Sequence, residues 1–224
     1  RWRARSSKNV ADEIEYLYKS FGHRHFSFMD DNFTLGRSRL IEICNEIERR
    51  KLDIQFETPN GLSVRTLDEE VLDSMVSAGL VRISLAIESG SDFIRNKIMK
   101  KNLPEEKIYD VINLTKKYKQ LYVHAFFIIG MPEETKETLN ETYDMIKKID
   151  VDKVYVHNII PFPGTAVFEQ ALRDNLLVNI DSQNLYKSAN LYLTNYDDYF
   201  IKPYKLSIED LREFRAKCEG LIAK

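Results

Sequence analysis

Acidic, amide and glycine residues recur in this sequence just after short apolar segments. The five segments are FSFMDDNFT (26–34), DIQFETPNG (53–61), VRISLAIESGS (81–91), HAFFIIGMPEET (124–135) and VYVHNIIPFPGT (154–165). In a parallel (β/α) barrel, a repeat of strand, polar loop and amphipathic helix gathers such residues at one rim. We therefore expect the chemistry of this chain at the carboxyl ends of its strands.

Three polar residues, Asp30, Asp31 and Asn32, directly follow the first apolar segment. Their oxygens could anchor the ammonium group of a ligand or coordinate a hard cation. An Asx turn, or the cap of the following helix, explains the same residues without a ligand. The residues alone leave both interpretations open.

Glu88 ends the third apolar run and is followed by Ser89. Strand alternation places Glu88 on the same face as Arg82 and Ser84. If that face looks into the barrel, the Glu88 carboxylate stands at the rim, where it could accept hydrogen bonds from sugar hydroxyls. The alternative is a carboxylate that only caps the helix beginning near Ser91.

The fourth segment ends in a glycine that leaves the backbone bare. Gly130 lets a flat ligand approach the main chain closely at a strand end. Alternation puts Ile128 on the same face as His124. His124 and His157 are each explained as well by a core position as by ligand binding.

The fifth segment ends in the loop NIIPFPG, from Asn158 to Gly164. Two prolines, Pro161 and Pro163, restrict the conformation of this loop. Its backbone amides and carbonyls could then recognise the edge of a purine. A plain turn is an equal explanation.

Hydrophobic periodicity predicts the elements that position these residues. Apolar residues at intervals of three and four predict helices with buried faces formed by Val10, Ile14, Leu17, Tyr18 and Phe21, by Leu40, Cys44 and Ile47, by Leu72, Met75 and Ala78, by Ile108, Val111 and Ile112, by Leu139, Tyr143, Ile146 and Ile149, and by Val167, Phe168, Ala171 and Leu172. The third helix opens with a capping box, Thr66 to Glu69, and stops at Gly79. Apolar runs near 25–30, 54–57, 81–88, 122–129 and 153–160 predict parallel strands between the helices.

These repeats predict an α/β fold, with a partial barrel over residues 1–175. The five visible units are too few for a closed eight-unit barrel. Residues 176–224 are expected to form a C-terminal helical extension that packs on the barrel and whose last helix starts at Ser207. We expect the tyrosines of this extension to serve packing.

Composition excludes several other classes of protein. The formal charge of −2 and hydrophobic content of 43% indicate an ordinary globular chain, with no basic excess that would indicate nucleic acid. No apolar run is long enough to span a membrane, and no secretory signal is visible, so we expect a cytoplasmic protein. Cys44 and Cys218 are expected to be buried free thiols. Dinucleotide-binding, P-loop and common hydrolase motifs do not occur.

Together, the five segments resemble those of radical S-adenosylmethionine (SAM) enzymes, in particular the subset that often carries an upstream cobalamin-binding domain. The resemblance covers about residues 1–175 and rests on separated motifs in the same order. It implies a partial (β/α)6 TIM-like barrel whose first strand is missing here. It also implies an enzyme that reductively cleaves SAM to a 5′-deoxyadenosyl radical, which abstracts hydrogen from a substrate that the sequence does not identify.

The resemblance also assigns roles to the polar segments. MDDNFT (29–34) matches the segment that holds the SAM amino group, IESGS (87–91) matches the one near the ribose and carboxylate, and NIIPFPGT (158–165) matches the one at the adenine edge. FFIIGMPEE (126–134) resembles the GxIxGxxE-type motif beside the adenine, with Phe126 in place of its first glycine. The expected cofactor-binding residues are Asp30, Asp31, Asn32, Asn60, Glu88, Ser89, His124, Ile128, Gly130, His157, Asn158 and Pro161.

One family motif, the CxxxCxxC loop that binds a [4Fe–4S] cluster, is absent from this sequence. Cys44 and Cys218 lie too far apart in the chain to replace it. We expect the loop upstream of these residues; otherwise the domain is a degenerate barrel that binds no cluster. The resemblance implies SAM, the cluster and, in the subset, cobalamin as cofactors, with an electron donor and a substrate as partners.

Two other functions compete with this interpretation. A metal-dependent barrel hydrolase or lyase could use Asp30, Glu88, His124 and His157 as ligands for one divalent ion. A non-enzymatic barrel could bind a partner protein at its rim. Metal analysis and SAM affinity distinguish the three.

Overall fold

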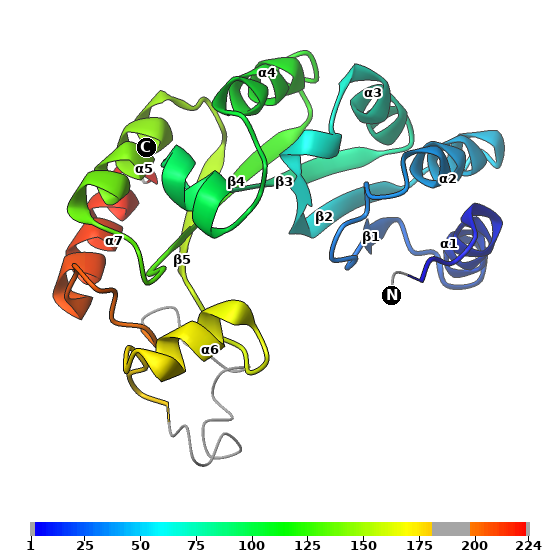
Figure 1. The fold of residues 1–224 in the computed structure, drawn as a ribbon. Coiled ribbons are helices and arrows are strands. Elements are labelled where there is room, and N and C mark those ends of the chain that lie inside the picture. The colour runs from blue at the N-terminus through cyan, green and yellow to red at the C-terminus, as the bar shows by residue number, and fades with distance from the viewer. Residues whose placement is uncertain (1–2, 181–197, 223–224) are drawn as a thin grey trace. The chain divides into compact units, whose positions relative to one another are not determined.

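The computed structural model describes residues 3–180 and 198–222 (Figure 1). Helices and strands alternate along the chain, as the sequence predicts. The strands are β1 (His25–Ser27), β2 (Gln55–Ser63), β3 (Leu80–Glu88), β4 (Tyr122–Ile129) and β5 (Lys153–Asn158). The helices are α1 (Ser7–Phe21), α2 (Arg37–Arg49), α3 (Glu69–Ser77), α4 (Glu105–Thr115), α5 (Lys136–Lys148), α6 (Ala166–Arg173) and α7 (Ile208–Ile222), with the short helices η1 (Val64–Thr66) and η2 (Phe93–Ile98).

The five strands form one sheet in chain order, β1-β2-β3-β4-β5. β1 pairs with β2 in parallel, with Phe26 opposite Phe56, and β2 pairs with β3 in parallel. Within the described residues this sheet does not close on itself. The predicted α/β fold, a partial barrel of parallel strands and helices, is confirmed.

The chain divides into two compact units. The first unit comprises Arg1–Ala86, Glu106–Ala125 and Asp150–Lys153. The second unit comprises Ile87–Glu105, Phe126–Ile149 and Val154–Lys224.

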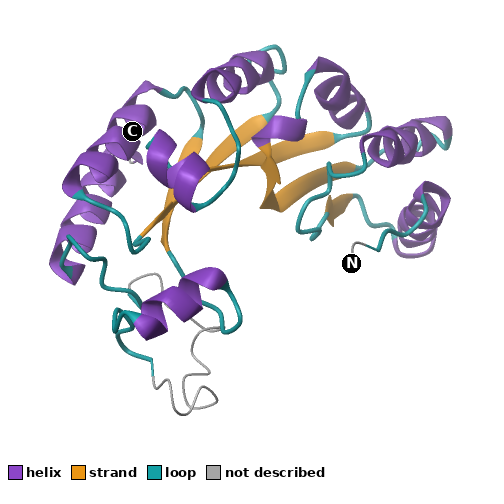
Figure 2. Ribbon diagram, viewed as in Figure 1, coloured by secondary structure: helices purple, strands orange, loops and turns teal. Residues whose placement is uncertain are grey.

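The first helix of the first unit begins and ends at residues with clear local chemistry. The Ser6 side chain accepts a hydrogen bond from the Asn9 amide at 3.2 Å, and Gly22, with φ 73°, ends the helix. Helix α1 packs against α2, and α2 against α3; Figure 2 shows these helices along one side of β1 and β2. The predicted buried face of α2, which includes Cys44 and Ile47, is confirmed.

Two local predictions in the first unit are wrong. Phe21 is 61% exposed, and its ring contacts that of Tyr16 at the surface. Helical spacing identifies the apolar face of a helix but not whether a neighbour covers its last turn. Asp68, not Thr66, caps α3 by accepting a hydrogen bond from the Val71 amide. The Thr66 hydroxyl instead donates to the Ser63 carbonyl.

Strand β2 is longer than the sequence predicts. It continues to Ser63 through the stretch that was expected to be a polar loop. Its register against β3 shifts between Thr58 and Leu62, and Gly61 in this shift has φ 89°. A bulge of this kind lets polar residues leave the ladder without ending the strand. Asn60 lies in this irregular part of β2.

Gly79 joins α3 to β3 at a point where no side chain fits. Its φ is 107°, and a Cβ atom added there would lie 2.1 Å from the Ile54 carbonyl oxygen. We expect Gly79→Ala to lower the free energy of unfolding by about 2–3 kcal/mol. The variant must adopt a strained φ, and the backbone near Ile54 must also move to make room for the added Cβ atom. Urea denaturation measures this change.

Gly22→Ala is the matched control for Gly79→Ala. Gly22 has φ 73°, but nothing lies within 4 Å of an added Cβ. This variant therefore carries only the cost of the left-handed conformation, about 1 kcal/mol. Equal losses in the two variants would contradict the steric explanation.

In the second unit, burial alternates along the end of β4. Phe127 and Ile129 are buried, whereas Phe126 and Ile128 are partly exposed. Helix α5 contacts α7, in which Leu211 and Cys218 are buried. The two cysteines are therefore buried free thiols, as predicted.

The described part of the C-terminal extension belongs to the second unit. Leu177 and Ile201 form an antiparallel bridge, and α7 starts after Ser207 as predicted. Of the tyrosines expected to pack, Tyr199 is buried and Tyr204 is half exposed. Tyr186, Tyr192 and Tyr196 lie outside the described residues. A domain boundary near residue 175 stays a prediction.

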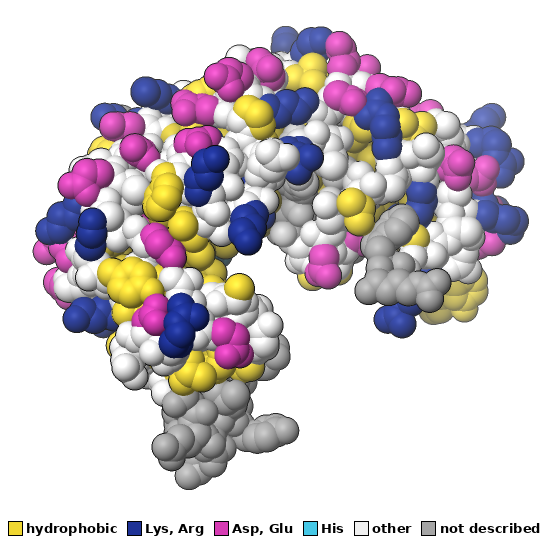
Figure 3. Space-filling model, in the orientation of Figure 1, with side chains coloured by type: hydrophobic (Ala, Val, Ile, Leu, Met, Phe, Trp, Pro, Cys, Tyr) yellow, Lys and Arg dark blue, Asp and Glu magenta, His cyan; other side chains and the backbone are white. Residues whose placement is uncertain are grey.

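The surface and the helices agree with the composition. On the face shown in Figure 3, Lys and Arg side chains are interspersed with Asp and Glu side chains. None of the described helices combines the length and the apolar character that crossing a bilayer requires.

Candidate functional site at the strand ends

The polar segments follow the carboxyl ends of β1, β3, β4 and β5. The residues MDDN begin two positions after the end of β1, and Glu88 is the last residue of β3. Gly130 follows β4 directly, and Asn158 is the last residue of β5. The predicted placement of these four segments along the chain is therefore confirmed.

In the first unit, the loop after β1 is held by an amide from β2. The Asn60 Nδ2 donates to the Met29 carbonyl at 3.0 Å, and the Thr34 hydroxyl donates to Asn32 Oδ1 at 3.1 Å. Asp30 and Asp31 are exposed between these two anchors. The structure thus brings Asn60 and the acidic loop together and leaves two carboxylates available to a cationic group.

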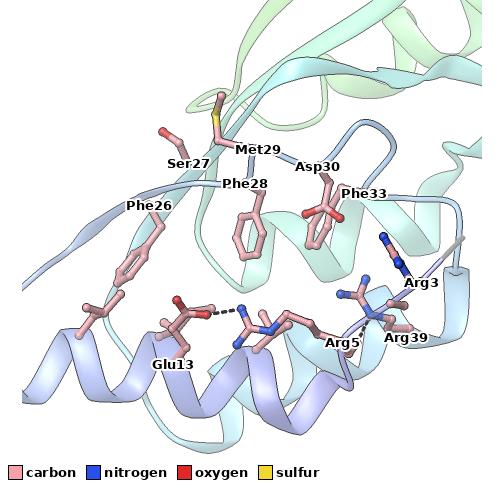
Figure 4. A pocket seen from close by; sticks show the side chains of 14 residues that line it. Arg3, Arg5, Glu13, Phe26, Ser27, Phe28, Met29, Asp30, Phe33 and Arg39 are labelled. Atoms are coloured by element: carbon pink, nitrogen blue, oxygen red, sulfur yellow. Dashed lines mark hydrogen bonds and ion pairs between the residues drawn. The ribbon is translucent and has the colours of Figure 1, made fainter.

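A cavity of about 410 Å³ lies beside this loop, between β1 and α1. Figure 4 shows the rings of Phe26, Phe28 and Phe33 pointing toward α1. Asp30 and three arginines complete part of the lining, which in full is Arg3, Ala4, Arg5, Val10, Glu13, Ile14, Leu17, Phe26, Ser27, Phe28, Met29, Asp30, Phe33 and Arg39. This cavity is thus mostly apolar at the helix and charged near the chain's first described residues.

His124 lies at the other end of its strand. It is the third residue of β4, 7% exposed, with its ring 5.1 Å from that of Tyr122. Burial lowers its pKa, as do Arg82 and Lys153, while Asp152 opposes them. A neutral imidazole at this position can pack or accept a hydrogen bond. The structure therefore does not place His124 at a carboxyl end, and its role as a cofactor ligand stays a prediction.

In the second unit, Glu88 has an unusual backbone conformation. Its φ is 73°, in the left-handed region that a glutamate rarely occupies. The residue is only 7% exposed, and its carboxylate accepts a hydrogen bond from Lys101 Nζ at 2.5 Å. Strained residues of this kind cluster at functional sites. Lys101, which no sequence pattern assigned to a site, therefore belongs to the candidate site together with Glu88.

The Lys101 ammonium is expected to stabilise the Glu88 conformation. We expect Lys101→Met to lower the free energy of unfolding by about 1–2 kcal/mol, because the nearly buried Glu88 carboxylate loses its cation. The loss is limited to this size because Lys101 is partly exposed, so solvent already screens the ion pair. Lys100→Met is the control, since Lys100 is exposed and should change stability by less than about 0.5 kcal/mol. Urea titrations in which both variants behave alike would contradict this role.

Ser89 and Gly90, which follow Glu88, are enclosed by α5 and η2. The Gly90 amide donates to Thr142 Oγ1 at 3.0 Å, and Ser89 Oγ lies 3.1 Å from the same hydroxyl. A Cβ atom at Gly90 would lie 2.5 Å from the Thr142 Cα. Because the Ser89 hydroxyl is buried and already bonded, Ser89 is better suited to shape the loop than to contact a ligand.

A buried arginine completes this loop and was missed by the sequence analysis. Arg95 in η2 is fully buried, and its guanidinium donates to the carbonyls of Ser89 at 2.8 Å, Gly90 at 3.1 Å and Leu103 at 2.9 Å. Arginine inside an amphipathic pattern is usually exposed, so no sequence signal distinguishes it. Short π-helical turns such as η2 do occur often at functional sites.

The turn after β4 is closed by a second residue that the sequence analysis missed. The Gly130 amide donates to the Glu134 carboxylate, and the Ile159 amide donates to the Ile129 carbonyl at 2.8 Å. Gly130 has φ 95°, which favours glycine. Burial raises the pKa of Glu134 to about 8, although the amides of Gly130 and Met131 oppose this shift. The GxIxGxxE-type pattern places its glutamate at Glu133, so the sequence indicated only the position next to Glu134.

Aromatic rings line β4 and β5 beside these turns. Phe126 lies edge-on to His157 at 5.7 Å, and Tyr155 stacks on His157 at 6.0 Å. Desolvation lowers the pKa of His157, as does Arg215, while Glu88 opposes them. The structure thus brings His157 and Phe126 together on one face, where Ile128 is also partly exposed.

The loop after β5 is anchored at its first residue. Asn158 Nδ2 donates to the Asp198 carbonyl at 2.9 Å, and Pro161 is buried. Asn158 and Pro161 thus fix the start of this loop, as the two prolines lead us to expect. Contact of this loop with a purine stays a prediction.

Metal and cluster ligands do not gather among the residues that the structure describes. Within residues 3–180 and 198–222, no group of three histidine, cysteine or acidic side chains is placed to hold a metal ion. Burial raises the pKa of both Cys44 and Cys218 to about 12, so neither is a ready thiolate. The described residues fit neither the metal-dependent hydrolase nor a [4Fe–4S] cluster bound by this chain alone.

The sequence of this chain is similar to those of several larger enzymes. A protein from Pyrococcus horikoshii described as an uncharacterized methyltransferase is 34% identical over 181 residues, covering 81% of this chain and 39% of that protein. Anaerobic magnesium-protoporphyrin IX monomethyl ester cyclase from Cereibacter sphaeroides is 33% identical, covering 79% of this chain and 29% of the cyclase. The chain thus spans about a third of the length of such relatives.

Solved structures show the same fold. The radical S-adenosylmethionine methyltransferase TsrM from Kitasatospora setae, with cobalamin and a [4Fe–4S] cluster bound, matches with a TM-score of 0.66 at 20% identity, covering 76% of this chain and 34% of that protein. Residues 1–146 match the family model of the radical SAM superfamily. This chain belongs to the radical SAM superfamily.

Proposed function

We propose that this chain is the SAM-binding part of a longer enzyme that cleaves SAM reductively and uses the product to abstract hydrogen from a substrate. One observation carries the proposal: the family's SAM-associated segments follow the carboxyl ends of β1, β3, β4 and β5 in the expected order. The match of residues 1–146 to the superfamily, whose members use SAM and a [4Fe–4S] cluster, supports it. When bound, the cluster supplies the electron for cleavage.

In the first unit, we assign the SAM amino group to the acidic loop. Asp30 and Asp31 present exposed carboxylates, and Asn32 and Asn60 take part in the hydrogen bonds that fix the loop. An ammonium group is the natural partner of two such carboxylates. His124, the third residue of β4, completes the proposed set in this unit.

In the second unit, we assign the polar parts of SAM to Glu88 and the adenine to the later loops. Glu88 is held at a strand end by Lys101, and Ser89 shapes the loop behind it. Gly130 and Ile128 from β4, and Asn158 and Pro161 after β5, offer main-chain groups beside the partly exposed ring of His157. Glu88 can accept hydrogen bonds from ribose hydroxyls in this position.

The cluster must have ligands outside the described residues, because the two cysteines here do not fit it. We propose that they come from a part of the longer protein that covers the apolar lining of the cavity beside β1. Phe26, Phe28 and Ile14 are the residues that such a segment would contact. This chain corresponds to about a third of the length of a methyltransferase that it resembles, so such a relative has room for a segment that carries the cluster ligands.

Cobalamin is proposed as a cofactor of the longer protein, not of this chain. The support is that curated relatives of this chain include methyltransferases, and that a solved structure with the same fold is described with cobalamin bound. Absorbance of the purified longer protein, before and after cobalamin is added, tests this proposal separately from SAM binding.

The experiment compares this chain with a longer protein that carries three clustered cysteines. Both are reconstituted anaerobically with iron and sulfide, and 5′-deoxyadenosine is measured by chromatography after a reductant is added. We expect the longer protein to cleave SAM and the 224-residue chain to be inactive, because the chain lacks cluster ligands. Cleavage by the short chain alone would contradict the proposal.

Variants of the longer protein test the assignment of the acidic loop. We expect Asp30→Asn with Asp31→Asn to weaken SAM binding about tenfold or more, which calorimetry measures. Asp53→Asn is the matched control, since Asp53 is an exposed carboxylate just before β2. No affinity for SAM in the longer protein, with stoichiometric zinc or manganese instead, would favour the hydrolase or lyase. Neither SAM nor metal would favour a binding module.

A further inference from the structure

The turn after β4 is held from outside by the C-terminal part of the chain. The Tyr204 amide donates to the Pro132 carbonyl at 3.0 Å. Gln170 in α6 donates to Glu133 Oε1 at 2.6 Å and to the Tyr204 hydroxyl at 3.2 Å. The turn that carries Gly130 therefore has partners on its outer side as well as its internal Glu134 bond.

Helix α7 also packs directly over Gly130. A Cβ atom built on Gly130 would lie 3.7 Å from Leu211 Cδ1 and 3.2 Å from Ile159 Cγ2. Leu211 is completely buried. Any loss of the Leu211 side chain therefore opens space against the backbone of this turn.

The same C-terminal stretch holds the end of β5. The Asp198 carbonyl accepts the hydrogen bond from Asn158, and the Tyr199 hydroxyl bonds with the side chains of Asn158 and Arg215. Tyr199 and Arg215 are both nearly fully buried. Asn158 is thus fixed by residues that lie far from it in the sequence.

This stretch is itself anchored to the end of α6. The Val178 amide donates to the Phe200 carbonyl, and the Lys202 amide to the Leu176 carbonyl, both at 2.9 Å. Lys136 in α5 pairs with Asp210 in α7 at 2.8 Å. Residues 198–211, which we name the clasp, therefore connect α5, α6 and both strand ends within the second unit.

We propose that the clasp positions the Gly130 turn and Asn158 for the adenosine part of SAM. The clasp lies outside residues 1–146, which match the superfamily, so this role is not a property of the matched segment. Tyr199, Tyr204 and Leu211 are positioning residues, because they act through Asn158, Pro132 and Gly130. The inference rests on the proposed function of these two loops, since only a bound SAM gives the positioning a consequence.

The test uses the longer protein and calorimetric titration with SAM. We expect Leu211→Ala to raise the Kd for SAM about tenfold, because small displacements of a binding loop weaken binding strongly. Leu211→Met should restore the wild-type Kd, since it refills the space. Cys218→Ala is the matched control: it removes a buried side chain from the same helix and should change the Kd less than about twofold.

A second pair of variants tests the hydrogen bond to the turn. Tyr204→Pro removes the amide that bonds to Pro132, whereas Tyr204→Phe keeps this amide and removes only the hydroxyl. We expect Tyr204→Pro to raise the Kd about tenfold and Tyr204→Phe to leave it within about twofold. Circular dichroism establishes that each variant is folded before titration.

Amide hydrogen exchange makes failure of the clasp distinguishable from failure of the proposed function. In Leu211→Ala, we expect faster exchange at Gly130 and Ile159 and unchanged exchange in β1 and β2. A wild-type protein that binds no SAM would overturn the proposed function. A wild-type protein that binds SAM, with Leu211→Ala and Tyr204→Pro binding equally well or exchange at Gly130 unchanged, would overturn the clasp. If Cys218→Ala bound SAM as weakly as Leu211→Ala, the effect would reflect only the general packing of α7. This result would also overturn the proposed positioning role of the clasp.

Discussion

Arg95→Ala is expected to lower the free energy of unfolding by about 3–5 kcal/mol, because three buried carbonyls lose their hydrogen bonds to the guanidinium and a cavity is left behind. The three carbonyls belong to Ser89, Gly90 and Leu103, and that of Leu103 also accepts a hydrogen bond from Asn96 Nδ2 at 3.0 Å. The change should also loosen the loop that follows Glu88. Urea denaturation followed by circular dichroism measures the stability.

Arg95→Met separates the packing of this side chain from its hydrogen bonds. Methionine fills much of the same volume but donates nothing, so we expect most of the loss to remain. Lys97→Ala, at an exposed position of the same short helix, is the control and should change stability by less than about 0.5 kcal/mol. If Arg95→Met were as stable as the wild type, the carbonyl contacts would not be the source of the effect.

Glu134 is expected to make stability fall as the pH rises from about 4.5 to about 8. Its folded-state pKa is raised to about 8 from the ordinary value of 4.5 by burial. The neutral acid is therefore favoured in the folded state, and this contribution is fully present below pH 4.5 and is lost as the pH rises through 8. The expected loss over the window is on the order of 4 kcal/mol.

Glu134→Gln isolates this contribution from other titrating groups. Glutamine mimics the neutral acid and keeps an acceptor for the Gly130 amide. The lowered pKa values of His124 and His157 give stability a pH dependence of the opposite sign, because their contribution to stability is lost as the pH falls. Both proteins contain these histidines, so their contribution cancels when the variant is compared with the wild type. We expect the wild type and the variant to be similar at pH 5 and the variant to be more stable at pH 8. Parallel curves between pH 5 and 8 would exclude the titration of Glu134 as the cause.

The site residues divide into those that a motif reveals and those that only contacts reveal. Asp30, Glu88, Gly130 and Asn158 each follow or end a predicted strand, so their sequence neighbours indicate where they lie. His124 shares the same motif run as Gly130 but lies near the start of β4. The predicted run 122–129 coincides with β4, so the position of His124 near the amino end of this strand could already be counted from the sequence.

The helices and strands could be predicted from the sequence, because the spacing of apolar residues along an element indicates its buried face. Predicted and observed strands agree closely for β3, β4 and β5, and α2 buries the predicted face. Local chemistry likewise predicted the end of α3 at Gly79. The order of the polar loops, and hence the family, also follows from the sequence.

Which side chains are enclosed, and by which neighbours, depends on long-range packing that the sequence pattern does not show. The burial of Arg95, the enclosure of Gly90 by α5, the exposure of Phe21 and the contact of Leu211 with Gly130 each depend on residues distant in the chain. The bulge that holds Asn60 depends in the same way on the register between β2 and β3. Spacing along one element contains no information about its neighbours, because burial is a property of the packed surfaces that long-range contacts bring together.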